Sequence, residues 1–168
     1  AMRQTQKIAL AIRTRWRETN MGDDEQKIFV DRFGSSISAA DTAYRLDRTL
    51  WDKQYEQATR LYPMVSDGLR KVAQARIALA KGNSNAPKLV DEVPSSLQGD
   101  AGLMFERTKW RRKHDDLAGA YALIRAAGNR LGEPDKWWEE RNVVIRDLMD
   151  TRNYQAAYDI AAHHGIDK

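Results

Sequence analysis

Apolar side chains recur along this chain at steps of three and four residues, and sustained strand-like alternation is absent. In the first segment, about residues 3–18, Ile8, Ile12 and Trp16 follow one another at four-residue steps. This spacing places the three side chains on one face of a helix. Similar segments follow almost to the end of the chain, so the pattern predicts an all-α protein of about ten short helices.

Local signals mark the ends of the first predicted helices. The acidic residues at 23–25 begin the second helix, because acids favour a helix N-terminus, and Gly34 ends it. Three side chains of this helix are expected in the core: Ile28, Phe29 and Phe33. Ser38 and Asp41 match a capping box, with Asp in place of the usual Glu.

The later helices show equivalent signals. Gly82 follows a predicted helix over 67–80, where glycine accepts the left-handed conformation, and Pro134 suits the first turn of a helix over 134–149. Residues 94–100 are the clearest irregular connection. The other segments with helical periodicity are about 54–65, 85–92, 100–113, 115–127 and 153–164.

One pattern repeats on the second helix of successive hairpins. It reads Tyr or Leu, two residues, Ala, two residues, then Leu or Ile, at Tyr55-Ala58-Leu61, Leu117-Ala120-Leu123 and Tyr154-Ala157-Ile160. A small Ala lets two helices approach closely, and its bulky neighbours fill the groove on either side. Chance recurrence of Ala-rich helices is the alternative, but Arg45 and Arg107 match with the same offset as the first two triplets.

Such hairpins bury their faces by stacking in series. We therefore predict a right-handed superhelix, an α-α solenoid of about five helical hairpins of the tetratricopeptide-like kind. It is expected to form a single domain over 1–168, with residues 1–2 interpreted as a remnant of cloning. A solenoid that ends without a polar cap exposes an apolar end, through which two copies can dimerise.

Composition excludes several classes of site. With 42% hydrophobic and 31% charged residues, the chain is expected to fold as an ordinary domain. It has no cysteine, which excludes disulfides, thiolate zinc sites and cysteine nucleophiles. Its histidines are His114, His163 and His164, and the adjacent pair diverges on a helix. We predict no metal site, no cofactor and no membrane span.

Paired carboxylates occur at 23–25, 115–116 and 139–140. Glycoside cleavage in most families needs two carboxyl groups across a cleft, one of them with a raised pKa. Each of these clusters lies in or near the first turn of a predicted helix, where a carboxylate is an ordinary partner of the helix dipole. We therefore predict no catalytic residue in this chain.

The basic side chains are the strongest candidates for binding. The net charge is +4, and the densest cluster interleaves with Trp110: Arg107, Lys109, Arg111, Arg112 and Lys113. Arginine beside an aromatic ring can bind an anionic glycan or a nucleic acid, although such side chains also serve as ordinary core and surface. Trp137, Trp138 and Arg141 complete the candidate glycan- or anion-contact set; one of the two tryptophans is expected in the core.

Six strings, in this order, resemble the helical domain of the soluble lytic murein transglycosylases, in particular their alphaproteobacterial branch. They are FVDRFG (29–34), RLDRTLW (45–51), AQARIAL (73–79), GLMFERTKWRRK (102–113), PDKWWEERN (134–142) and YQAAYDIA (154–161), followed by His163-His164-Gly165. Each string alone is weak, but together they extend over nearly the whole chain.

The resemblance implies a periplasmic protein associated with peptidoglycan. Members of that family cleave the bond between N-acetylmuramic acid and N-acetylglucosamine to anhydromuramyl products, using a C-terminal lysozyme-like domain with a single catalytic Glu. A superhelical domain precedes that catalytic domain. The family's Glu-Ser motif is absent here, since no Glu is followed by Ser, so the activity cannot be placed on this chain.

The sequence therefore predicts a non-catalytic superhelical scaffold of a peptidoglycan-cleaving enzyme. One alternative is a tetratricopeptide-like solenoid that binds a peptide or a partner protein. A second and weaker alternative is a basic helical domain that binds nucleic acid through residues 107–113.

Overall fold

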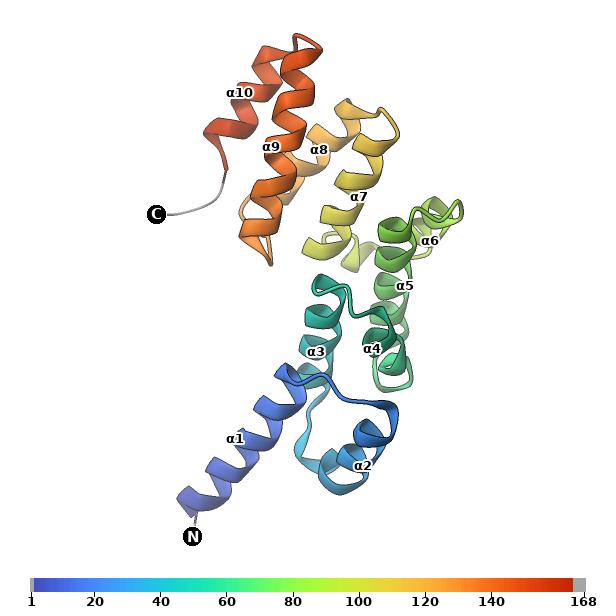
Figure 1. Ribbon diagram of the computed structural model, residues 1–168, viewed down its shortest axis with the longest axis vertical. Helices are drawn as coiled ribbons and strands as arrows, with labels where there is room; N and C mark the ends of the chain where they lie inside the picture. Colours follow the sequence, from blue (N-terminus) through green and yellow to red (C-terminus); the bar gives the residue numbers. More distant parts are fainter. Residues whose placement is uncertain (1, 165–168) are drawn as a thin grey trace. The chain divides into compact units, whose positions relative to one another are not determined.

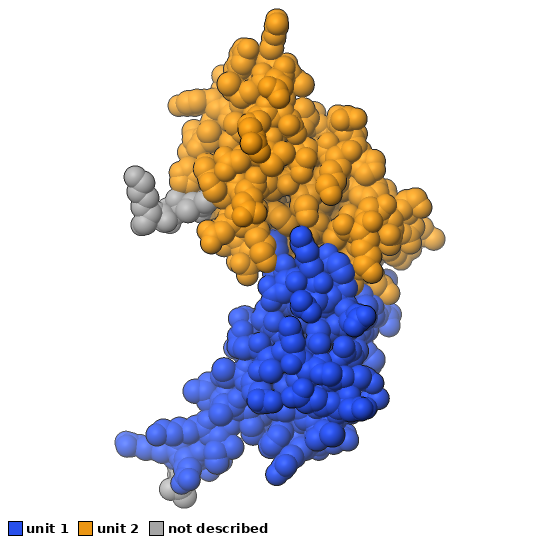
Figure 2. Space-filling view, viewed as in Figure 1, with its two compact units in different colours: residues 1–73 blue, residues 74–168 orange. Residues whose placement is uncertain are grey.

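The computed structural model describes residues 2–164, and in that range the chain is helical throughout, with no strand (Figure 1). Its ten α-helices are joined by tight turns and three short 3-10 segments, so the prediction of an all-α fold is confirmed. The chain forms two compact units, residues 1–73 and 74–168, coloured blue and orange in Figure 2. The single continuous superhelix and its handedness stay predictions.

The first unit consists of four helices and the beginning of a fifth. Their bounds are α1 (Met2–Glu18), α2 (Asp23–Phe33), α3 (Ala39–Trp51) and α4 (Tyr55–Arg60), with 3-10 segments η1 (Gly34–Ser36) and η2 (Tyr62–Met64); α5 (Asp67–Lys81) begins here and continues into the second unit. The expected helix over 54–65 is interrupted because Pro63 disfavours the α conformation of the residue before it.

Trp16 lies at the centre of the first unit. Its side chain is fully buried, and its ring stacks on that of Phe29 with centroids 5.8 Å apart. Ile28, which was expected in the core, is 65% exposed. Adjacent residues on a helix point about 100° apart, so the face that buries Phe29 turns Ile28 toward solvent.

The second unit contains the longer hairpins. It comprises the end of α5, α6 (Ala86–Asp91), η3 (Ser95–Leu97), α7 (Ala101–Lys113), α8 (Leu117–Ala127), α9 (Pro134–Asp150) and α10 (Tyr154–Ala162). Helix α7 packs against α8, α9 packs against α10, and α8 also contacts α9. The core includes Trp137, whose ring meets the edge of Phe105 at 5.4 Å between centroids.

Three hairpins, α3–α4, α7–α8 and α9–α10, close with the same backbone turn. Lys53, Asp115 and Arg152 adopt positive φ angles of 58°, 60° and 61°. In each case the next residue's N–H donates to the carbonyl oxygen five positions earlier, over 2.8, 2.9 and 2.8 Å. This is the Schellman arrangement, which satisfies carbonyl groups in the last helical turn.

The alanines of the repeated pattern occupy equivalent buried positions. Ala58, Ala120 and Ala157 are all buried, as close helix packing requires. Their bulky neighbours are less uniform, because Tyr154 is exposed and Leu123 is only partly buried beside the buried Ile124. The three hairpins thus share a buried alanine and a turn type, whereas the exposed Tyr154 fills no groove, contrary to the prediction.

Candidate functional site

The basic cluster of α7 divides between two sides of the helix. Arg107, Trp110 and Arg111 are three or four residues apart and therefore share one side, together with His114 at the C-terminal end. Lys109 belongs to another side. The structure thus brings three of the predicted site residues together and separates the rest.

A hollow of about 290 Å³ opens on the side of α7 that carries Arg107. It is lined by Leu79, Pro87, Val90, Asp91, Arg107, Trp110, Arg111, His114 and Asp116, contributed by α5, α6, α7 and the start of α8. Leu79 and Val90 are buried and form an apolar wall, while charged side chains surround the mouth. We refer to these nine residues as the α7 pocket.

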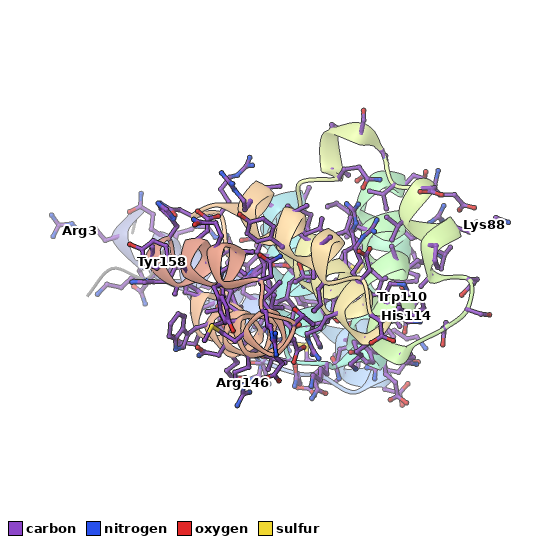
Figure 3. The ribbon with its side chains drawn as sticks, turned by 90° about the horizontal axis from the view of Figure 1, so that it is seen from above. Arg3, Lys88, Trp110, His114, Arg146 and Tyr158 are labelled. Atoms are coloured by element: carbon purple, nitrogen blue, oxygen red, sulfur yellow. The ribbon has the colours of Figure 1, made fainter. Side chains whose placement is uncertain are left out.

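Trp110 and His114, labelled near one another in Figure 3, stack on one another and line the pocket. Their ring centroids are 4.0 Å apart and the ring planes differ by 25°. The Nδ1 atom of His114 lies 2.8 Å from the Trp110 carbonyl oxygen. Because a carbonyl only accepts hydrogen bonds, this nitrogen carries the proton, and the ring is fixed in place.

Arg107 is a cation that no carboxylate of the described residues contacts. Its Nη1 atom donates to the neutral Oε1 atom of Gln98 over 3.2 Å. Burial lowers the pKa of Arg107, and the charge of Arg111 lowers it further, while Asp91 acts in the opposite direction. The guanidinium group has thus lost much of its hydration without gaining a full counter-charge.

Arg111 is committed to a neighbouring ion pair. Its Nη1 atom lies 2.5 Å from Oδ2 of Asp116, whose other oxygen accepts from the Gly119 N–H over 2.8 Å and caps α8. These two hydrogen bonds, the one from Arg111 first, lower the pKa of Asp116. A Cβ atom on Gly119 would lie 2.2 Å from Asp116 Oδ2, so a larger residue here would displace the paired Asp116 and Arg111 side chains.

Lys109 and Arg112 are also neutralised by carboxylates. Arg112 donates from Nε and Nη2 to both oxygens of Glu140 on α9, over 2.7 and 3.1 Å, and this raises the pKa of Arg112. Lys109 Nζ lies 3.4 Å from Oε2 of Glu106. Glu140, which was interpreted as a partner of the helix dipole, is instead buried and links α7 to α9.

Trp137 and Arg141 do not reach the surface. Their side chains are 0% and 1% exposed, and the Arg141 guanidinium lies 5.7 Å from the centre of the Trp137 ring. Both residues therefore leave the candidate anion-contact set, because a glycan cannot touch a buried side chain. Trp138 is 37% exposed and meets the ring of His164 edge-on at 5.7 Å.

Buried arginines are the feature that sequence reasoning missed. Arg45 donates from Nη1 to the Trp16 carbonyl oxygen over 2.7 Å, with its guanidinium 4.4 Å from the Trp16 ring, and burial lowers its pKa to about 10. Arg141 donates to the carbonyl oxygens of Gly128, His163 and His164. Both neutralise carbonyl groups at helix C-termini, where a positive charge is favourable.

Two further titratable residues contact groups of their own helix. Asp23 pairs with Lys27, and His163 Nδ1 lies 3.0 Å from the Asp159 carbonyl oxygen. No group of three or more His, Cys, Asp or Glu side chains between residues 2 and 164 is placed to hold a metal ion. Within the same range, no helix has both the length and the apolar content needed to cross a bilayer. Gly165 of the quoted strings lies outside the described residues.

Comparisons with protein-family models, with curated proteins and with solved structures found no match for this chain. Its function is therefore inferred from its residues and their geometry. The α7 pocket is the candidate site, because it combines a hollow, an aromatic stack and a partly buried cation.

Proposed function

We propose that this chain is a non-catalytic helical-repeat scaffold that associates with peptidoglycan in the periplasm, as part of an enzyme resembling the soluble lytic murein transglycosylases. The observation that carries this proposal is the repeated closure of α3–α4, α7–α8 and α9–α10 by one turn type over a buried Ala. Repeated helix hairpins typically serve as scaffolds and binding surfaces. The link to peptidoglycan derives from the six sequence strings.

The charges of α7 also favour a glycan or peptide over nucleic acid. Lys109, Arg111 and Arg112 each lie within ion-pair distance of a carboxylate, which reduces the net positive charge of the cluster. Binding of nucleic acid depends on unneutralised cations that displace counterions from phosphates. The Arg107 guanidinium beside Trp110 instead contacts the neutral side chain of Gln98, so its charge is available to a single anionic group.

Sedimentation with purified sacculi tests the proposal. The chain is expected to pellet with insoluble peptidoglycan at low salt, and to release no soluble muropeptides during prolonged incubation. Absence of the chain from the pellet would contradict the association. Muropeptide release that is abolished by replacing one specific carboxylate would contradict the non-catalytic role.

A protein-interaction solenoid is the second candidate, and α10 gives it a specific basis. Tyr154 and Tyr158 lie four residues apart on one side of α10 and are 57% and 70% exposed. Exposed tyrosines are enriched at protein interfaces. If this candidate is correct, Tyr158→Ala abolishes capture of a periplasmic protein while wild-type chain fails to pellet with sacculi.

A further inference from the structure

The α7 pocket presents one cation outside any ion pair of the described residues, next to an apolar wall. Between residues 2 and 164, no carboxylate lies within ion-pair distance of Arg107, whereas Arg111 is paired with Asp116. Leu79 and Val90 are buried at the base of the same hollow. A ligand that satisfies both features carries an anionic group directly beside a small apolar group.

The size of the pocket limits what it can take. Its volume of about 290 Å³ lies at the lower end of the range for small-molecule pockets. A single amino-acid residue or a comparable small acid fits this volume, whereas a folded partner or a nucleic-acid strand does not. A planar guanidinium group binds a carboxylate through two parallel hydrogen bonds, which suits it to the end of a peptide chain.

The stacked rings of Trp110 and His114 form one wall of the pocket. His114 contacts both the Trp110 ring and the Trp110 carbonyl oxygen, and contacts of this kind reduce the freedom that a side chain loses when a ligand binds. A second hollow in the same unit is lined by Arg125 and Asp159 among others, and these two charged groups are paired with each other. There Asp159 accepts the Tyr121 hydroxyl over 2.7 Å and lies 3.5 Å from Arg125 Nε, so its charge is already compensated.

We propose that the α7 pocket is a binding site for the free carboxylate of a C-terminal peptide residue with an apolar side chain. The carboxylate binds the Arg107 guanidinium, and the apolar side chain packs on Leu79 and Val90. Trp110 covers the backbone between these two groups. This proposal does not depend on the association with peptidoglycan, since it concerns a ligand that many peptides present.

The test is an NMR titration of the full chain with N-acetyl-leucine, using N-acetyl-leucinamide as the uncharged probe. Chemical-shift changes are expected at the α7 pocket with N-acetyl-leucine, with a dissociation constant of about 1 mM, which corresponds to about −4 kcal/mol. The amide probe is expected to bind at least tenfold more weakly. Equal binding of both probes, or no shift changes at 20 mM N-acetyl-leucine, would overturn the proposal.

Two arginine variants separate the pocket from general surface charge. Arg107→Gln is expected to weaken N-acetyl-leucine binding at least tenfold. Arg146→Gln is the matched control, because Arg146 is exposed on α9 and lies away from Trp110 and His114 in Figure 3. Equal losses in the two variants would contradict a specific site. If Arg107→Gln does not fold, the comparison of the two probes on the wild-type chain still decides the question.

Discussion

At the scale of single residues, hydrogen bonds and burial decide what each charged group does. Asp41 illustrates this, because its carboxylate is almost fully buried at the start of α3. Its Oδ2 atom accepts from the backbone and the hydroxyl of Ser38 over 2.9 and 2.7 Å, and its Oδ1 atom lies 2.6 Å from Arg17. The capping box predicted from the sequence is thus present and is extended by a cation from α1.

Replacing Asp41 with Asn should make the stability of the chain less dependent on pH. Burial alone would raise the pKa of Asp41, but the hydrogen bonds from Ser38 and Arg17 outweigh it and lower the pKa. A lowered pKa stabilises the folded state above the ordinary value near about 3.9, and that stabilisation is lost as the pH falls through the folded value.

Urea unfolding of wild type and Asp41→Asn at pH 7 and at pH 3 measures this effect. At pH 7 the variant is expected to lose about 1–3 kcal/mol of unfolding free energy, as for a buried group whose hydrogen-bond partners are left unpaired. The difference between the two proteins should shrink at pH 3. A difference that is the same at both pH values would contradict the role assigned to the carboxylate.

Replacing Arg141 with Met should destabilise the chain strongly, although the two side chains have similar volume. Arg141 donates to carbonyl groups at the ends of α8 and α10, which a methionine leaves without partners. The expected loss is about 3 kcal/mol in unfolding free energy, measured by urea titration. Arg146→Met, on the exposed side of the same helix, is expected to change it by less than about 0.5 kcal/mol. Similar losses in both variants would contradict the capping role.

At the scale of elements, the ends of some helices follow from local sequence. Gly82 has a φ of 73°, as predicted, and Pro134 is the first residue of α9. The positive φ angles at Lys53, Asp115 and Arg152 were not predicted, because Lys and Arg carry no signal for the left-handed conformation and Asp adopts it only occasionally. Each of these residues lies in the turn between two packed helices, and the Schellman turn there requires this conformation.

This observation predicts a stabilising substitution. Arg152→Gly should raise the unfolding free energy by about 0.5–1 kcal/mol, because glycine relieves the cost of a positive φ, although it gains freedom in the unfolded chain. Arg146→Gly, at an exposed position in the interior of α9, serves as the opposite control and should lose about 1 kcal/mol. Both are read from the midpoint of thermal or urea unfolding. Destabilisation by Arg152→Gly would show that its side chain has a role that outweighs the backbone strain.

A contact between distant elements is a further feature that the helical pattern did not indicate. A Cβ atom on Gly102 would lie 2.0 Å from the guanidinium carbon of the buried Arg76, so the lack of a side chain at residue 102 leaves room for the Arg76 side chain that reaches α7 from α5. In the sequence, Gly102 appeared only as an unremarkable position in the first turn of a helix. Its requirement comes from Arg76, which lies far away along the chain and near it in space.

At the scale of the whole molecule, the sequence by itself determined the helices, most of their ends and the buried alanines of the hairpins. These features depend on periodicity and on contacts within a few residues, which a sequence displays directly. The tertiary structure decided which charges are free. It paired Arg112 with Glu140, buried Arg141, and left Arg107 beside a hollow. Helix periodicity gives the direction of a side chain but not its distant neighbour, and the neighbour determines whether a charge is neutralised, buried or available to a ligand.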